Sequence, residues 1–128
     1  MALIKEYFEL TKKYCNEYGE KTILLMQVGA FFEVYGILDK KTNNISNSQI
    51  LEFSRICDLA VVEKNVCVGK DNVVMAGIKD IILWNIYLQT HSPVWNLETG
   101  QIGLYLVYKV SERKTYNWSH YNTKNLNL

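Results

Sequence analysis

The stretch Gln27–Gly36 constrains the fold most, because it ends an apolar run that begins at Thr22 and is dominated by Val, Phe and Tyr. β-branched and aromatic residues favour extended structure, so we predict a strand here. The first part of the run, Thr22–Val28, reads as a continuous apolar strand, which is typical of a strand covered on both faces. Gly29 interrupts the run, and we expect a bulge or a close backbone approach there before the strand continues as Phe31–Tyr35.

Side chains alternate between the two faces of a strand, so this pattern separates Phe31 and Glu33 from Phe32 and Val34. The second pair is purely apolar and suits a hydrophobic core. The first pair sets an aromatic ring beside a carboxylate, which is costly to bury without a partner. We therefore expect Phe31 and Glu33 to be exposed at a surface that a ligand occupies.

Two short segments carry a resemblance to a known family. Residues 29–35, Gly-Ala-Phe-Phe-Glu-Val-Tyr, resemble the Gly-x-Phe-Tyr-Glu motif of the MutS family of DNA mismatch-repair proteins, which lies in the family's N-terminal mismatch-recognition domain. Residues 74–78, Val-Met-Ala-Gly-Ile, resemble the Pro-Met-Ala-Gly-Ile segment that follows at a similar distance. The variant over Leu25–Glu33 is similar to the branch found in large DNA viruses and coral mitochondria.

The resemblance spans roughly residues 2–82 and implies both a fold and a function. The implied fold is an α/β (α+β) domain over residues 1–110, with a mixed β-sheet flanked by helices. The implied function is the binding of mismatched or kinked double-stranded DNA in mismatch repair. The implied partners are double-stranded DNA with a mismatch or an unpaired base, and a homologous subunit or a full-length MutS protein. Ala30 replaces the acidic residue common in bacterial members and Phe32 replaces Tyr, but neither is a residue proposed to meet DNA.

The resemblance also assigns roles to single residues. Phe31 matches the family's aromatic wedge, which is driven between bases and kinks the duplex. Glu33 matches the glutamate that hydrogen-bonds the displaced base. Met75, Ala76 and Gly77 are expected either in a neighbouring loop beside the DNA or at a buried strand end, and both interpretations stay open.

Periodicity predicts the other elements. Apolar residues recur every three to four positions over Leu3–Tyr18, which predicts an amphipathic helix that stops at Gly19. The polar and weakly basic tail, residues 111–128, is expected to fray. Between them we predict a surface loop over Gly36–Ser48, a helix over about Gln49–Asp58 capped by Ser46 or Ser48, a hairpin or bent strand over Leu59–Val68, a short strand over Val73–Ala76, a helix over Lys79–Gln89, and a strand over Gln101–Val110.

Composition limits the partners and the compartment. The net charge is only +1, which argues against an autonomous high-affinity DNA binder and fits a module that reads DNA shape while other domains hold the backbone. The 3 cysteines lack metal-ligand spacing, so we expect no metal and buried free thiols in a reducing compartment. No signal peptide or membrane span is visible, so we expect an intracellular protein of the cytoplasm or a viral replication site, neither secreted nor membrane-bound.

The sequence gives no support for an enzyme. Gly69 and Lys70 lack the preceding glycine and the following hydroxyl of a phosphate-binding loop, so we expect no cofactor and no counterpart of the ATPase of full-length MutS proteins. His91 and His120 have no paired ligand or nucleophile, so no residue set supports a hydrolase. The alternative from another class is a truncated protein-interaction module that keeps the fold but not DNA binding, with an apolar surface around Trp84, Trp95 and Trp118.

Overall fold

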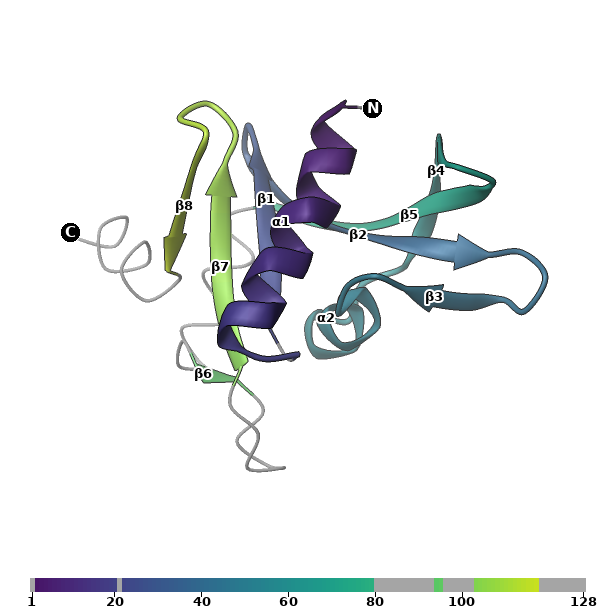
Figure 1. Ribbon diagram of the computed structural model, residues 1–128, viewed down its shortest axis with the longest axis horizontal. Helices are drawn as coiled ribbons and strands as arrows, with labels where there is room; N and C mark the ends of the chain where they lie inside the picture. Colours follow the sequence, from purple (N-terminus) through teal and green to yellow (C-terminus); the bar gives the residue numbers. More distant parts are fainter. Residues whose placement is uncertain (1, 21, 80–93, 96–102, 118–128) are drawn as a thin grey trace.

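The computed structural model describes residues 2–20, 22–79, 94–95 and 103–117 (Figure 1). In this part of the chain, two helices and a mixed sheet of seven strands form an α+β fold with one long N-terminal helix. The short strand β6 (Val94–Trp95) additionally pairs with the start of β7. The helices are α1 (Ala2–Tyr18) and α2 (Ile50–Cys57), and the strands of the mixed sheet are β1 (Ile23–Val28), β2 (Phe31–Asp39), β3 (Asn44–Ser46), β4 (Val62–Val68), β5 (Asp71–Lys79), β7 (Gly103–Lys109) and β8 (Lys114–Asn117).

The sheet has the order β4-β5-β2-β1-β7, with β3 pairing with the end of β2 and β8 pairing with β7. Among the described strands, β1 and β7 run parallel and the other pairs run antiparallel. β1 therefore lies between β2 and β7, and its residues Ile23–Met26 are almost completely buried. The prediction of a strand covered on both faces is confirmed for Ile23–Met26, whereas Val28 at the end of β1 is 39% exposed.

Gly29 lies in a turn, and the predicted bulge within one continuing strand is wrong. The chain reverses over Gly29 and Ala30, so that Val28 pairs with Phe31 and β1 forms an antiparallel hairpin with β2. Gly29 has a positive φ of +59°, and Ala30 does not adopt a positive φ. A two-residue hairpin turn with this pattern takes glycine at its first central position. Phe31 is therefore the first residue of β2, directly beside a tight turn.

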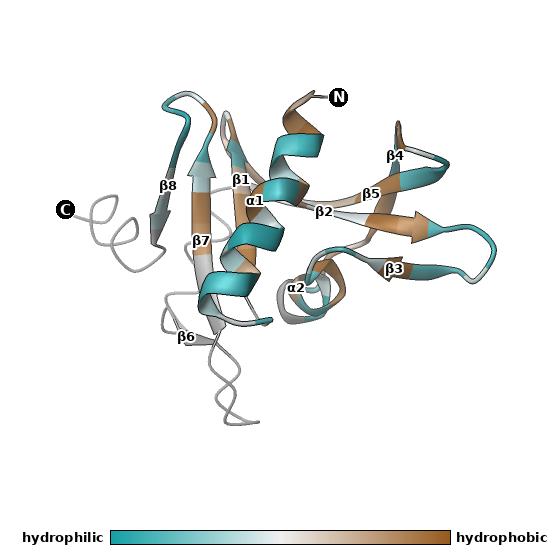
Figure 2. Cartoon of the chain, viewed as in Figure 1, coloured by the Kyte–Doolittle hydropathy of each residue, from teal (hydrophilic) through white to brown (hydrophobic). Residues whose placement is uncertain are grey.

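Helix α1 forms as predicted and covers part of the sheet with its apolar stripe. Its buried residues Ile4, Tyr7 and Thr11 follow the three-to-four spacing of one helix face. The completely buried Tyr7 donates a hydrogen bond of 2.8 Å from its hydroxyl to the carbonyl oxygen of Leu24. Its ring meets the ring of Tyr35 edge to face, with centroids 5.0 Å apart. Figure 2 shows that the outward face of α1 is largely hydrophilic.

Helix α2 packs against β2 and β5 through Ile50 and Phe53, which are fully buried. Its approach requires Gly36, because a Cβ at this position would lie 2.7 Å from Cγ2 of Ile50. The predicted cap at Ser46 or Ser48 is wrong, because the N-cap is Gln49 and forms no side-chain capping hydrogen bond. Ser48 precedes the cap, and its Oγ accepts a hydrogen bond of 3.2 Å from the Ile50 N–H. The helix ends at Cys57, and the C-cap Asp58 adopts a left-handed conformation with a φ of 53°.

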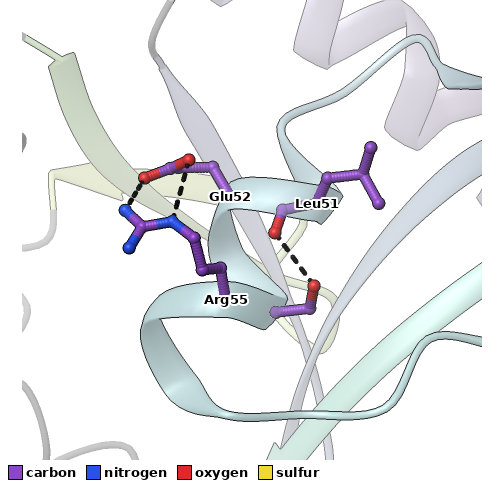
Figure 3. Close-up of polar contacts among 4 residues, drawn as sticks. Leu51, Glu52 and Arg55 are labelled. Atoms are coloured by element: carbon purple, nitrogen blue, oxygen red, sulfur yellow. Dashed lines mark hydrogen bonds and ion pairs between the residues drawn. The ribbon is translucent and has the colours of Figure 1, made fainter.

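The outer surface of α2 is held by local contacts (Figure 3). Arg55 reaches back one turn to form an ion pair with Glu52. The Ser54 hydroxyl donates a hydrogen bond of 2.9 Å to the Leu51 carbonyl. Such exposed ion pairs contribute about 1 kcal/mol or less. The Leu51 side chain itself is 53% exposed.

The predicted surface loop over Gly36–Ser48 is wrong where β2 continues and where Asn44–Ser46 form β3. β2 continues to Asp39, and Ile37–Asp39 pairs with β3. Asn43, at a φ of 60°, supplies the left-handed residue of the connecting turn. The polar residues of this segment therefore belong to a hairpin tip, and the apolar residues on either side of the tip extend the sheet.

Strand β5 is longer than the predicted Val73–Ala76, and Gly77 lies inside it. Gly77 pairs with Glu33, and Met75 pairs with Tyr35. The predicted loop beside DNA is thus wrong for the backbone of these residues, because a nine-residue strand runs through them. The predicted hairpin or bent strand over Leu59–Val68 is the single strand β4, which begins at Val62 and whose register against β5 shifts between Glu63 and Cys67.

The C-terminal third is only partly described. The predicted strand Gln101–Val110 is present as β7, and β8 pairs with it within the tail that was expected to fray. The predicted boundary between residues 110 and 111 therefore falls between two paired strands. Only Lys79 of the predicted helix Lys79–Gln89 is among the described residues, and it is the last residue of β5. The residues outside the described ranges also include Trp84, Trp118, His91 and His120. None of the helices in the described ranges is long and apolar enough to cross a membrane.

Candidate functional site

A shallow hollow of about 380 Å³ opens on one face of β2, β5 and the start of β4. It combines residues from the two segments that the sequence singled out. The antiparallel register explains this, because Glu33 lies opposite Gly77 and Tyr35 opposite Met75. The lining residues are Phe31, Glu33, Ala60, Val62, Met75 and Gly77.

Phe31 lies at the rim of this hollow and is 43% exposed. Its neighbours along the strand, Phe32 and Val34, are fully buried, so the predicted division of faces is confirmed. A phenylalanine ring has about 200 Å² of surface, so roughly 90 Å² of this ring faces solvent. Covering that area with a ligand would release about 2 kcal/mol. The exposed ring therefore has the area to anchor an apolar or stacked ligand group.

Glu33 lines the hollow and is held there by Tyr35. The Tyr35 hydroxyl donates a hydrogen bond to Oε1 of Glu33. Burial raises the pKa of Tyr35 well above its usual range, and the hydrogen bond to Glu33 and its charge raise this pKa further. The hydroxyl therefore remains a donor over the whole physiological pH range, and the carboxylate has the buried partner that its position requires.

Two residues near the hollow, Tyr35 and Lys64, were not singled out by the sequence. The Lys64 ammonium lies 3.9 Å from Sδ of Met75 and 5.7 Å from the centroid of the Tyr35 ring. Tyr35 continues the alternation of Phe31 and Glu33, so the strand pattern could have identified it. Lys64 lies within the register shift of β4, and its place beside Tyr35 and Met75 depends on how β4 pairs with β5.

Four of the five predicted contact residues meet at this hollow, and Ala76 does not. Ala76 is 1% exposed and pairs with the buried Val34, so its side chain points into the core. Its neighbours Met75 and Gly77 point the other way and line the hollow. Because side chains alternate along β5, Met75 and Gly77 line the surface hollow, whereas Ala76 belongs to the core.

The cysteines and acidic residues form no other candidate centre in the described ranges. There, no group of three or more His, Cys, Asp or Glu residues could hold a metal ion. The expected burial of Cys67 is wrong: Cys67 is exposed, because it lies on the edge strand β4. Cys15 is partly buried. Burial raises the pKa of the Cys15 thiol. The side chain of Cys57 lies outside the described set.

A larger hollow of about 710 Å³ lies between α1 and the segment that precedes α2. Its walls include Phe8, Thr11 and Cys15 from α1 and Gln49 from the other side. The amide of Gln49 donates a hydrogen bond of 2.8 Å to the Glu20 carbonyl, which ties the two sides together. None of the predicted contact residues lines this hollow.

Comparison with known proteins adds no relative. A scan against protein-family models and a search of curated proteins both find no match for this chain.

Proposed function

We propose that this chain binds mismatched or kinked double-stranded DNA in the manner of a MutS N-terminal mismatch-recognition domain, with Phe31 as the wedge and without catalysis of its own. One observation carries the proposal: Phe31 is 43% exposed beside a hollow that unites it with Glu33, Met75 and Gly77. The two motif segments, residues 29–35 and 74–78, lie far apart in the sequence and meet through strand pairing. Both segments resemble the family, and their meeting at one surface supports the resemblance.

The energetics of a wedge favour weakly stacked DNA. Inserting an apolar side chain between base steps costs a few kcal/mol because the bases must unstack. Stacking a base on an aromatic ring returns about 1–3 kcal/mol. The balance is close to zero for a well-stacked duplex and favourable where a mismatch has already weakened the stack. Phe31 lies at the start of β2 beside the tight turn at Gly29 and is 43% exposed, as such an insertion requires.

Glu33 adds selectivity to the wedge. A carboxylate is repelled by phosphates, so it disfavours contact with the backbone of regular DNA. It also accepts a hydrogen bond from a base donor, or donates one when protonated. Gly77 leaves the space beside Glu33 open, since a Cβ at this position would lie 3.6 Å from Cγ of Glu33.

We expect the affinity of the isolated chain to be weak. Its net charge of +1 supplies little of the phosphate attraction that dominates most protein–DNA affinities. A homologous subunit or a full-length MutS protein would supply the grip on the backbone. Low salt strengthens the electrostatic part of binding and is therefore the condition in which to measure it.

The proposal is tested by fluorescence anisotropy with a labelled duplex that carries one mismatch and a matched homoduplex. We expect the wild type to prefer the mismatch and Phe31→Ala to lose this preference. Leu51→Ala is the control, because Leu51 is an exposed apolar residue on α2 that does not line the hollow. Equal and measurable binding of both duplexes by the wild type and by Phe31→Ala would rule out the wedge.

A second candidate function is a protein-interaction module, and the same face favours it. Val28, Phe31 and Val62 are 39%, 43% and 47% exposed, so three large apolar side chains face solvent. An exposed apolar surface marks interaction sites in soluble proteins. In this case the chain would form a complex of defined mass in analytical ultracentrifugation, and Phe31→Ala would weaken the complex and leave DNA unaffected.

A further inference from the structure

The hydrogen bond between Tyr35 and Glu33 has a consequence for selectivity. We propose that Tyr35 is a positioning residue, which fixes the Glu33 carboxyl group so that only its second oxygen faces a bound nucleic acid. This inference rests on the proposed function and concerns how the hollow chooses between a mismatch and a regular duplex.

Tyr35 is itself rigidly placed. It is 3% exposed, and its ring packs edge to face against the Tyr7 ring at 5.0 Å and 87°. On another side, the Lys64 ammonium lies 5.7 Å from the ring centroid. A ring held between an aromatic neighbour and a cation has little rotamer freedom. The position of its hydroxyl is therefore set by the fold and is not adjusted when a ligand arrives.

The hydroxyl is a permanent donor to one oxygen of Glu33. It donates to Oε1, while Oε2 has no hydrogen-bond partner in the part of the chain that the structure describes. An ionised carboxylate then offers Oε2 as an acceptor for a base donor. A neutral carboxyl group keeps Oε1 as the carbonyl oxygen that accepts from Tyr35, and its O–H at Oε2 becomes a donor. Tyr35 thus directs the same atom toward the ligand in both protonation states.

The hydrogen bond from Tyr35 lowers the conformational-entropy cost of binding a ligand at Glu33. A free glutamate at the surface loses rotamer freedom when it binds, and preorganisation avoids that loss. It also keeps the charge at one place in the hollow, where phosphates of a regular duplex are repelled. Without Tyr35 the carboxylate can turn away from the ligand, which weakens mismatch binding and relieves the repulsion.

The test is a double-mutant cycle on the ratio of mismatch to homoduplex affinity, measured by anisotropy. Tyr35→Phe keeps the ring and removes only the hydroxyl. We expect it to lower the ratio by about two- to tenfold, the range that corresponds to ordering one side chain. In the Glu33→Ala background the same substitution should leave the ratio unchanged, because Tyr35 acts through Glu33. Tyr7→Phe is the matched control, since it removes another buried hydroxyl that bonds the Leu24 carbonyl.

Each result of the cycle either supports or contradicts the positioning role of Tyr35. An equal drop with and without Glu33 would show that Tyr35 supports the fold only, and an unchanged ratio in a discriminating protein would also overturn the inference. If Tyr35→Phe fails to fold, Glu33→Asp replaces it, because the shorter side chain keeps the charge but withdraws it from the hydroxyl. Glu33→Asp should lower the ratio similarly, and full discrimination by it would contradict the inference. A wild type without any mismatch preference would instead remove the proposed function, and with it this role of Tyr35.

Discussion

Truncating the two neighbouring rings Phe31 and Phe32 gives the most direct test of how β2 divides its side chains. Phe32 is fully covered and Phe31 is 43% exposed. With about 200 Å² per ring and about 25 cal/mol per Å², burial contributes up to about 5 kcal/mol for Phe32 and up to about 3 kcal/mol for Phe31. These are upper bounds, because the unfolded chain already covers part of each ring. Truncation of Phe32 also leaves a cavity, whereas the space left at Phe31 is open to water.

We therefore expect Phe32→Ala to lower the free energy of unfolding by about 4 kcal/mol and Phe31→Ala by less than about 2 kcal/mol. Urea unfolding followed by circular dichroism measures both. With an m-value of about 2 kcal/mol/M, the midpoint should fall by about 2 M for Phe32→Ala and by less than about 1 M for Phe31→Ala. If Phe32→Ala does not fold, Phe32→Leu takes its place with an expected loss of about 1 kcal/mol. A loss at Phe31 equal to or greater than that at Phe32 would refute the assignment of faces.

Three further predictions concern other positions. Gly36→Ala should destabilise the fold by about 1–3 kcal/mol in urea unfolding, because its Cβ would lie 2.7 Å from Cγ2 of Ile50; an unchanged midpoint would contradict the close approach of α2. Gly77→Ala should keep or raise the stability by up to about 1 kcal/mol, since its Cβ meets Glu33 only at 3.6 Å, and should reduce mismatch preference in anisotropy by filling the hollow. Burial raises the pKa of Tyr7, so the folded state keeps a proton that the unfolded chain loses above about pH 10. Stability is then fully present below pH 10 and falls by up to about 1.4 kcal/mol per pH unit above it; urea midpoints at high pH should fall less in Tyr7→Phe than in the wild type.

Local sequence patterns predicted α1 and β1 correctly, because the residues within each element determine its secondary structure. The apolar stripe of α1 and the apolar run of β1 gave the right element at nearly the right boundaries. The alternation of Phe31 and Glu33 with Phe32 and Val34 gave the right faces, because period two belongs to any strand. Strand propensity and side-chain alternation were thus sufficient for the centre of the site.

These local patterns could not predict which distant residues pair across the sheet. Nothing local distinguishes a glycine in a bulge from a glycine in a two-residue turn, and Gly29 was therefore misplaced. The place of the partly buried Met75 at the hollow and the burial of Ala76 in the core follow from the register of β5 against β2, which depends on contacts across the sheet. The place of Lys64 over the Tyr35 ring likewise depends on how β4 pairs with β5 through its register shift.

The parallel pairing of β1 with β7 decides which pieces of this chain can fold alone. Ile23 pairs with Tyr105, so the central strand acquires its second neighbour only from a segment far downstream. A shortened chain that stops near residue 82 would leave the backbone of β1 as an unpaired and highly apolar edge, which invites aggregation. Such long-range closure also slows folding, because distant segments must meet before the sheet is complete. Expression of a soluble fragment therefore requires residues through β7, even though both motif segments lie upstream of it.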